Sequence, residues 1–146
     1  MALGFVGVGN MGAPMARCIA KAGNSVMLYD TRPEITAPLL AETNLFTVAP
    51  DLATLGRTCR TVVTMLPDSR IVRRVTLGGR NVPGLSDGLG HGSIVVDMSS
   101  SFAPDTVKLG GDLVRRGVQL VDAPHQRDVL DAGGLEPARP VSPVAD

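Results

Sequence analysis

The chain has 146 residues, of which 44% are hydrophobic and 19% charged, a balance typical of globular proteins. Fourteen basic residues offset fourteen acidic ones, so no basic block predicts binding to nucleic acid or to a membrane surface. The cysteines, Cys18 and Cys59, form no metal-binding or disulfide pattern, and the apolar N-terminal run is too short for a signal peptide or a membrane span. We therefore expect a cytoplasmic protein without a metal site.

The first half of the chain alternates between strand and helix patterns. Residues 3–8 are predicted to form a buried strand, and Met11, Met15 and Ile19 recur at helical spacing in a helix that ends at Gly23. Strands are expected at residues 25–30 and 45–50. A helix over residues 33–42 separates them, and a short helix starts at Asp51.

The next segment continues the alternation with a strand at residues 61–66. A helix capped by Asp68 or Ser69 follows, with Ile71, Val72 and Val75 on one side. Residues 78–92 are rich in glycine, which predicts mostly loop.

Two more strands are expected at residues 93–98 and 118–123. Between them, residues 104–117 are predicted to form a helix with Val107, Gly111 and Val114 stacked on one face. Such alternation favours a doubly wound α/β fold, with a mostly parallel sheet of about six strands. After Pro124 the periodic patterns stop. We expect one domain over residues 1–124 and a divergent, disordered tail over residues 125–146.

Three glycines after the first strand predict a phosphate-binding turn. Gly7, Gly9 and Gly12 have the spacing G-x-G-x-x-G at the start of a helix, and Asp30 ends the next strand 18 residues after Gly12. In a Rossmann-type domain the first glycine permits a tight turn, the second leaves room for pyrophosphate, and the third allows close helix–strand packing. The helix N-terminus would receive the phosphate charge, and Asp30 would bind the ribose hydroxyls.

The residues beside this turn bear on the choice of cofactor. The charge of Asp30 would repel a 2′-phosphate, so we expect NAD rather than NADP. Arg32 lies two residues further on and could bind a 2′-phosphate, which keeps NADP open. The alternative is that the glycines serve only a turn and that Asp30 is a solvated strand end.

The segment GFVGVGNMGAPMARCIAKAG (residues 4–23) closely resembles the N-terminal signature of the β-hydroxyacid dehydrogenases, a family that includes 3-hydroxyisobutyrate dehydrogenase. Val8 and Cys18 depart mildly from that signature. The segments TMLPD (64–68), DMSSS (97–101) and VDAP (121–124) match in the same order, so the resemblance spans about residues 2–124. It implies hydride transfer between a small 3-hydroxy acid and NAD, and homo-oligomers in full-length relatives.

The motif and the resemblance together indicate three groups of cofactor-binding residues. They are Gly7, Val8, Gly9, Asn10, Met11 and Gly12 in the first turn, Asp30, Thr31 and Arg32 after the second strand, and Met65, Leu66, Pro67 and Ser100 further on. The resemblance implies that the backbone of the Leu66–Pro67 pair lies alongside a ribose of the cofactor and that Ser100 reaches its nicotinamide end. Taken alone, Pro67 reads as a strand stop, and the serines at 99–101 read as helix caps.

The resemblance is lost after Pro124. HQR (125–127) stands where the family has a Val-Ser-Gly-Gly turn, and the family's helical second domain with its catalytic lysine is absent from this sequence. We predict no catalytic residue, since Lys21 and Lys108 belong to other helices and His91 and His125 read as exposed. The expectation is a truncated dehydrogenase, through gene truncation or a shifted reading frame, that binds dinucleotide but turns over little or nothing. The alternative is a non-catalytic dinucleotide-binding module or an inactive remnant.

Overall fold

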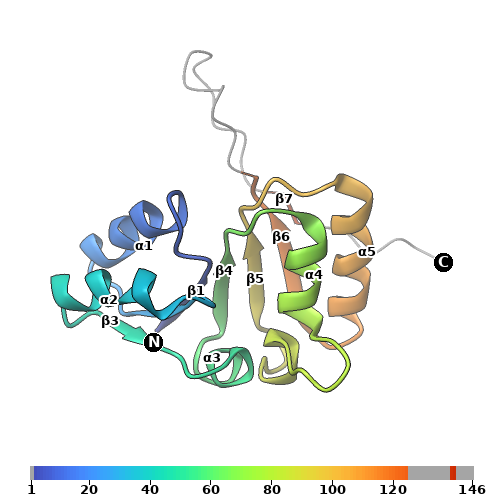
Figure 1. The fold of residues 1–146 in the computed structure, drawn as a ribbon. Coiled ribbons are helices and arrows are strands. Elements are labelled where there is room, and N and C mark those ends of the chain that lie inside the picture. Colours follow the sequence, from blue (N-terminus) through green and yellow to red (C-terminus); the bar gives the residue numbers. More distant parts are fainter. Residues whose placement is uncertain (1, 125–138, 141–146) are drawn as a thin grey trace, which may run out of the picture.

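A computed structural model describes residues 2–124 and 139–140, in which strands and helices alternate as predicted (Figure 1). The elements in chain order are β1 (Leu3–Val6), α1 (Gly12–Lys21), β2 (Val26–Tyr29), α2 (Pro33–Glu42), β3 (Phe46–Val48), α3 (Leu52–Thr58), β4 (Thr61–Thr64), α4 (Ser69–Leu77), the 3₁₀ turn η1 (Leu85–Asp87), β5 (Ile94–Asp97), α5 (Ala103–Val114), β6 (Gln119–Asp122) and β7 (Arg139–Pro140).

All strands belong to one sheet with the order β3-β2-β1-β4-β5-β6-β7. The first six strands are parallel, and the two-residue β7 pairs antiparallel with β6. This confirms the predicted Rossmann-type architecture. Strand β1 lies between β2 and β4, so the strand order reverses there. Such a switch point is where open α/β sheets bind ligands, outside the carboxyl ends of the strands.

Strand β7 falls within the segment predicted to be a tail. Residues 125–138 and 141–146 lie outside the described residues. The predicted boundary at residue 124 and the predicted disorder beyond it therefore stay predictions.

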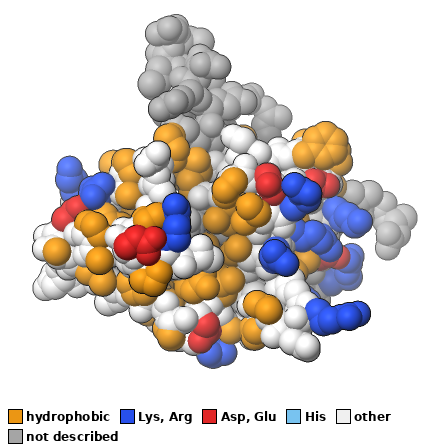
Figure 2. Space-filling model, viewed as in Figure 1, with side chains coloured by type: hydrophobic (Ala, Val, Ile, Leu, Met, Phe, Trp, Pro, Cys, Tyr) orange, Lys and Arg blue, Asp and Glu red, His pale blue; other side chains and the backbone are white. Residues whose placement is uncertain are grey.

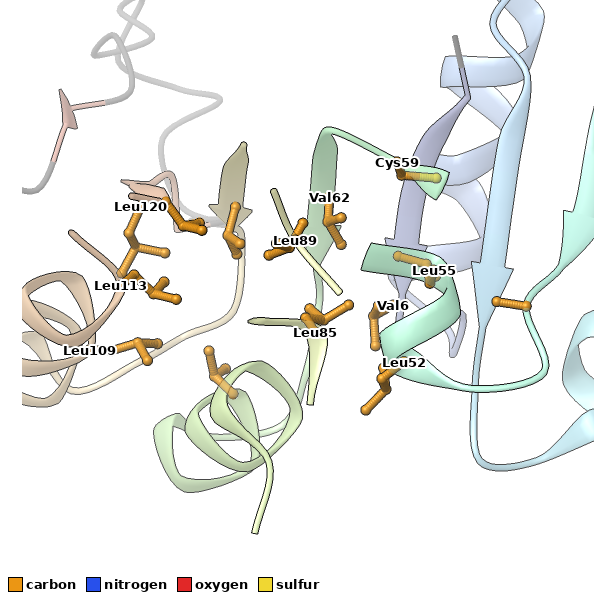
Figure 3. Packing of buried hydrophobic residues seen from close by; sticks show 14 residues of the cluster. Val6, Leu52, Leu55, Cys59, Val62, Leu85, Leu89, Leu109, Leu113 and Leu120 are labelled. Carbon is orange, nitrogen blue, oxygen red and sulfur yellow. The ribbon is translucent and has the colours of Figure 1, made fainter. Parts of the chain in front are cut away.

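The two faces of the sheet carry separate hydrophobic cores, because neighbouring residues in a strand point to opposite sides. Phe5 packs with α1 and α2 on one face, while Val6 belongs to the core on the other face. Figure 3 shows this second core, where Leu52 and Leu55 of α3 and Leu109 and Leu113 of α5 surround the strands. Helices therefore cover both faces of the sheet, as the doubly wound prediction requires.

Side-chain caps define the start of two helices. Asp51 accepts a hydrogen bond from the Thr54 N–H (2.7 Å) at α3, and Asp68 accepts one from the Ile71 N–H (3.0 Å) at α4. Of the two cap residues considered for α4, Asp68 is the one used. Each cap satisfies a backbone donor that the helix cannot satisfy itself.

In two helices the buried face is not the stripe of residues named from the sequence. In α1 the fully buried residues are Gly12, Ala16 and Ala20, with Met15 and Ile19 only partly buried at the edge of the core. Small residues face the sheet here because the helix lies close against it.

In α5 the stripe of Val107, Gly111 and Val114 expected from the sequence is present, but it is not the buried one. Val107 and Val114 are 38% and 41% exposed, whereas Leu109 and Leu113 are 2% and 0% exposed. The helix carries two apolar stripes, and the stripe with the larger side chains packs against the sheet because it removes more apolar surface from water.

The glycine-rich segment at 78–92 contributes more to the core than a surface loop would. It contains η1, and Leu85 is fully buried against α3 and α4. Gly88 allows this close approach, since a Cβ there would lie 1.9 Å from the Ala53 carbonyl oxygen.

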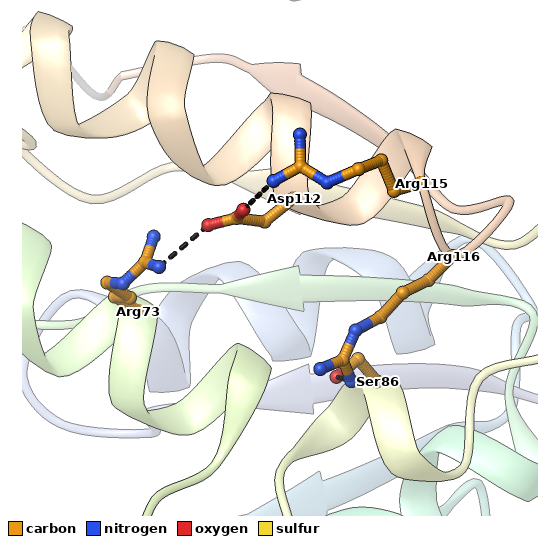
Figure 4. Close-up of polar contacts among 5 residues, drawn as sticks. All are labelled: Arg73, Ser86, Asp112, Arg115 and Arg116. Carbon is orange, nitrogen blue, oxygen red and sulfur yellow. Dashed lines mark hydrogen bonds and ion pairs between the residues drawn. The ribbon is translucent and has the colours of Figure 1, made fainter.

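Polar contacts join the helices on one side of the molecule. Asp112 of α5 accepts a hydrogen bond from Arg73 of α4 (2.7 Å) and pairs with Arg115, and Arg116 donates to Ser86 of η1 (2.6 Å) (Figure 4). Lys and Arg side chains gather on this side of the surface (Figure 2). Among the helices that the structure describes, none has the length and apolar character that crossing a membrane requires.

Candidate functional site

A cavity of about 480 Å³ lies beyond the ends of β1, β2 and β4. This volume is in the range of small-molecule and cofactor sites. Fifteen residues line it: Val6, Gly7, Gly9, Asn10, Met11, Gly12, Tyr29, Asp30, Thr31, Arg32, Met65, Leu66, Pro67, Ile71 and Val75. All the predicted cofactor-binding residues except Val8 and Ser100 are among them, so segments far apart in the sequence meet at the switch point.

Two of the three glycines are required by the protein's own packing. Gly7 has a φ of +91° and donates its N–H to the Tyr29 carbonyl (3.0 Å), and a Cβ there would lie 2.2 Å from the Met65 carbonyl oxygen. A Cβ at Gly12 would lie 1.8 Å from the Gly7 carbonyl oxygen. Any side chain at either position would collide with backbone. The turn therefore has its shape because of these two glycines.

Gly9 differs from both, because the protein does not need a glycine there. Its φ is not positive, and a Cβ would meet nothing closer than an Arg32 guanidinium nitrogen at 3.9 Å. The space that a side chain would fill belongs to the cavity. A residue without a Cβ at this point lets a ligand approach the backbone, which is the requirement of a pyrophosphate.

The first turn of α1 offers backbone donors to that space. The helix starts at Gly12 with Met11 as N-cap, no side chain caps it, and its first turn has no acidic residue. The Ala13 N–H bonds to the Gly9 carbonyl (3.0 Å) and Pro14 has no N–H, so the N–H groups of Met11 and Gly12 are the ones left to water or to a ligand. The helix dipole favours an anion there.

Asp30 is held firmly at the second wall of the cavity. One carboxylate oxygen accepts the Val8 N–H (3.1 Å), and the other accepts the Arg32 N–H (3.0 Å). Its side chain is only 7% exposed, while that of Arg32 is 60% exposed and reaches Asp30 through a longer 3.5 Å contact. A buried, hydrogen-bonded carboxylate and an exposed guanidinium thus lie side by side at the rim of the cavity.

The remaining wall is apolar and comes from β4 and α4. Leu66 and Pro67 follow β4, and Ile71 and Val75 face the cavity from α4. Sequence reasoning missed Val6, Tyr29, Ile71 and Val75. The sequence pattern grouped Ile71 and Val75 with Val72 on one side of α4; in the structure Val72 is buried, whereas Ile71 is 37% exposed. Their i, i+4 spacing on the helix that follows the Leu-Pro pair was the available signal.

The two predicted residues outside the lining have different surroundings. Val8 is buried in the core on the α1 side, and its contribution to the site is the backbone N–H bound to Asp30. Ser100 is exposed on the loop after β5, so its contact with a cofactor stays a prediction. The neighbouring Ser99 is fully buried and accepts a hydrogen bond from the Leu66 N–H (2.8 Å).

The ionisable side chains of the cavity lining are those of Tyr29, Asp30 and Arg32. Lys21 lies in the last turn of α1, and Lys108 is exposed on α5. His91 packs against Gly117 and does not line the cavity, while His125 lies outside the described residues. Within residues 2–124 and 139–140, no three His, Cys, Asp or Glu side chains form a group that could hold a metal ion.

Comparisons with known proteins agree with this geometry. Residues 2–129 match the family described as the NAD binding domain of 6-phosphogluconate dehydrogenase. The chain is 30% identical over 131 residues to 3-sulfolactaldehyde reductase of Escherichia coli (strain K12), an alignment that covers 90% of this chain and 42% of that protein. It is 34% identical over 123 residues to mitochondrial 3-hydroxyisobutyrate dehydrogenase of Drosophila melanogaster, covering 84% of this chain and 36% of that protein.

A solved structure shows the same similarity in three dimensions. The crystal structure of 3-hydroxyisobutyrate dehydrogenase from Salmonella typhimurium superposes with a TM-score of 0.77 at 26% identity, covering 90% of this chain and 44% of that one. The chain thus spans about two fifths of the length of the relatives it matches.

Proposed function

Because the chain belongs to the family of NAD-binding domains represented by that of 6-phosphogluconate dehydrogenase, we propose that its cavity binds the pyrophosphate and adenosine portion of NAD. The observation that carries the proposal is the vacant space at Gly9, which the fold does not need and an anionic diphosphate does. The first turn of α1 would hold the phosphates, and Asp30 would hold the adjacent ribose. NAD is favoured over NADP because the buried Asp30 carboxylate would repel a 2′-phosphate, whereas the exposed Arg32 leaves NADP as the second candidate.

In the longer proteins of this kind, we propose that this domain serves hydride transfer between a small 3-hydroxy acid and NAD. Bound NAD would supply the nicotinamide ring that accepts or donates the hydride. The chain's own contribution is to bind and orient the dinucleotide and, through Leu66, Pro67, Ile71 and Val75, to shield part of it from water. The names of the similar hydroxyacid dehydrogenases support this substrate class.

The alternative is a dinucleotide-binding module without turnover. This alternative is supported by the cavity lining: the described residues that form it include no lysine or histidine that could act as a general acid or base. A positioned acid–base group typically contributes about 10²–10⁴-fold to a rate, so the chain by itself should turn over little or nothing.

The direct test is whether NAD raises the melting temperature of the purified chain. A ligand at 100 times its Kd stabilises the native state by about 2.7 kcal/mol, which is readily seen in a thermal scan. Replacement of Gly9 by Leu should abolish the shift and leave the melting temperature without ligand nearly unchanged, because its side chain would fill the cavity rather than collide with backbone.

Gly90→Leu is the matched control. A Cβ at Gly90 also meets nothing within 4 Å, but this residue lies outside the cavity. Gly90→Leu should keep the NAD shift. An NAD shift that survives in Gly9→Leu, or no shift with NAD or NADP in the parent chain, would contradict the proposed site. A 3-hydroxyisobutyrate oxidation assay on the same samples separates the dehydrogenase from the module without turnover.

A further inference from the structure

A buried carboxylate stands behind the apolar wall of the cavity without touching the cavity itself. Asp97, the last residue of β5, is 1% exposed and is the register partner of Thr64 in β4. We propose that Asp97 is a positioning residue, which acts through Ser99 to hold the Leu66–Pro67 wall where a dinucleotide needs it. This inference rests on the proposed function of the cavity.

Three donors converge on the Asp97 carboxylate. Its Oδ1 accepts the Thr64 hydroxyl (2.8 Å) and the Ser99 N–H (3.1 Å), and its Oδ2 accepts the Ser101 hydroxyl (3.0 Å). These bonds tie the end of β4 to the loop that follows β5. Buried hydrogen-bond networks of this kind restrict a site to one arrangement when every member is satisfied.

Ser99 passes this restraint to the cavity wall. It is fully buried, and its Oγ accepts the Leu66 N–H at 2.8 Å. The Met65 N–H still bonds in the sheet, to the Val6 carbonyl, but at Leu66 the chain leaves the sheet. At Leu66, the first residue of the wall, the backbone N–H therefore bonds to the Ser99 hydroxyl instead of to a neighbouring strand. Asp97 in turn accepts the backbone N–H of Ser99.

Helix capping does not account for these serines. Helix α5 begins at Ala103 with Phe102 as N-cap, and no side chain makes a capping bond there. The reading of the serines at 99–101 as caps is therefore wrong. Ser99 and Ser101 are directed instead to Leu66 and to Asp97.

The test compares Ser99→Ala with Ser101→Ala in the full chain. Each variant loses one hydroxyl of the same network, but only Ser99 contacts the wall. The Kd of NADH is measured by fluorescence titration at a temperature where circular dichroism shows every variant folded. We expect Ser99→Ala to weaken NADH binding about tenfold, from the loss of one buried hydrogen bond that positions the wall, and Ser101→Ala to leave the Kd nearly unchanged.

Two substitutions of Asp97 complete the test. Asp97→Asn keeps an oxygen acceptor for Thr64 and Ser99 and should bind NADH almost as the parent does. Asp97→Val keeps the approximate shape without acceptors and should bind as weakly as Ser99→Ala. Should Asp97→Val fail to fold, the serine pair decides the question.

The outcomes separate the two proposals. A parent chain that binds neither NADH nor NADPH overturns the proposed function, and the role of Asp97 falls with it. A parent that binds, together with a Ser99→Ala variant of equal affinity, overturns only the positioning role. Equal losses in Ser99→Ala and Ser101→Ala would also overturn it, because they would indicate general loosening of the loop.

Discussion

At the scale of single residues, Asp30 has a structural role to which the proposed function adds a recognition role. Its two oxygens already accept the Val8 and Arg32 N–H groups, which fixes the ends of two loops against each other. An ionised carboxylate offers about four lone-pair directions, so acceptors remain for ribose hydroxyls. The same charge disfavours a 2′-phosphate.

Replacement of Asp30 by Ala should therefore weaken NADH binding about tenfold or more, the cost of charged hydrogen bonds to a sugar. NADPH should lose less, because its 2′-phosphate no longer faces a carboxylate and Arg32 is released from Asp30. Fluorescence titrations with both coenzymes measure the ratio. Asp51→Ala, which removes the exposed helix cap of α3 away from the cavity, is the control. An unchanged NADH-to-NADPH ratio in Asp30→Ala would contradict the assignment.

The site was predictable from the sequence where local geometry decides it. Gly7, Gly12 and Asp30 stand at fixed distances along one strand–helix–strand unit, and the structure places them together. Ile71 and Val75 were missed because the side of α4 that faces the cavity depends on how the helix packs on β4, which periodicity does not reveal. The network of Asp97 was missed for the same reason, since it joins residues 33 positions apart.

At the scale of elements, α5 shows why an apolar pattern can be assigned to the wrong side. Val107 and Val114 recur at helical spacing, and so do Leu109 and Leu113. Both stripes satisfy the amphipathic pattern. The choice follows from side-chain volume, because the leucines fill the space between α5 and the sheet that the valines would leave partly empty.

Leu109→Ala should lower the free energy of unfolding by about 2–5 kcal/mol, the usual cost of a cavity at a buried leucine. Val107→Ala should cost clearly less, because Val107 is 38% exposed. Urea denaturation of both variants measures the difference. The reverse order would contradict the burial of the leucine face.

At the scale of the whole molecule, the alternation of strands and helices correctly predicted a parallel, doubly wound sheet. The order of its strands was not available from local pattern, since it depends on where the chain crosses over β1 after β3. The antiparallel β7 was not predicted either. Its two residues carry no strand pattern of their own, and their assignment as a strand comes from pairing with β6.

The carboxylates also predict how stability responds to pH. The hydrogen bond from Arg73 lowers the pKa of Asp112 below its ordinary value of 3.8, and a hydrogen bond from Arg17 lowers the pKa of Glu42. Each group therefore adds stability above the pKa of the unfolded chain, and that stability is lost as the pH falls through the native pKa. Burial, with a smaller contribution from Asp97, raises the pKa of Asp122, so its contribution has the opposite sign and is lost as the pH rises.

Two variants should thus change the acid response in opposite directions. Asp112→Asn should lower the free energy of unfolding near neutral pH by about 0.5 kcal/mol, because the pair with Arg73 is partly exposed. The difference from the parent chain should shrink as the pH falls below 3.8. Asp122→Asn should become relatively more stable as the pH rises above about 4. Urea titrations at several pH values measure both, and parallel curves for parent and variants would refute the signs.

The close approach of Gly12 to the Gly7 carbonyl, which leaves no room for a Cβ, has a consequence for the proposed binding. The loop between β1 and α1 is closed by the protein's own backbone, so its conformational entropy is lost when the chain folds and not when a dinucleotide arrives. If the cavity binds a dinucleotide as proposed, association need not wait for a rearrangement of this loop, because the backbone donors for the diphosphate are already in place. A variant with a flexible β1–α1 loop would offer the same backbone donors but would bind the dinucleotide more weakly, because the loop would have to be ordered on binding.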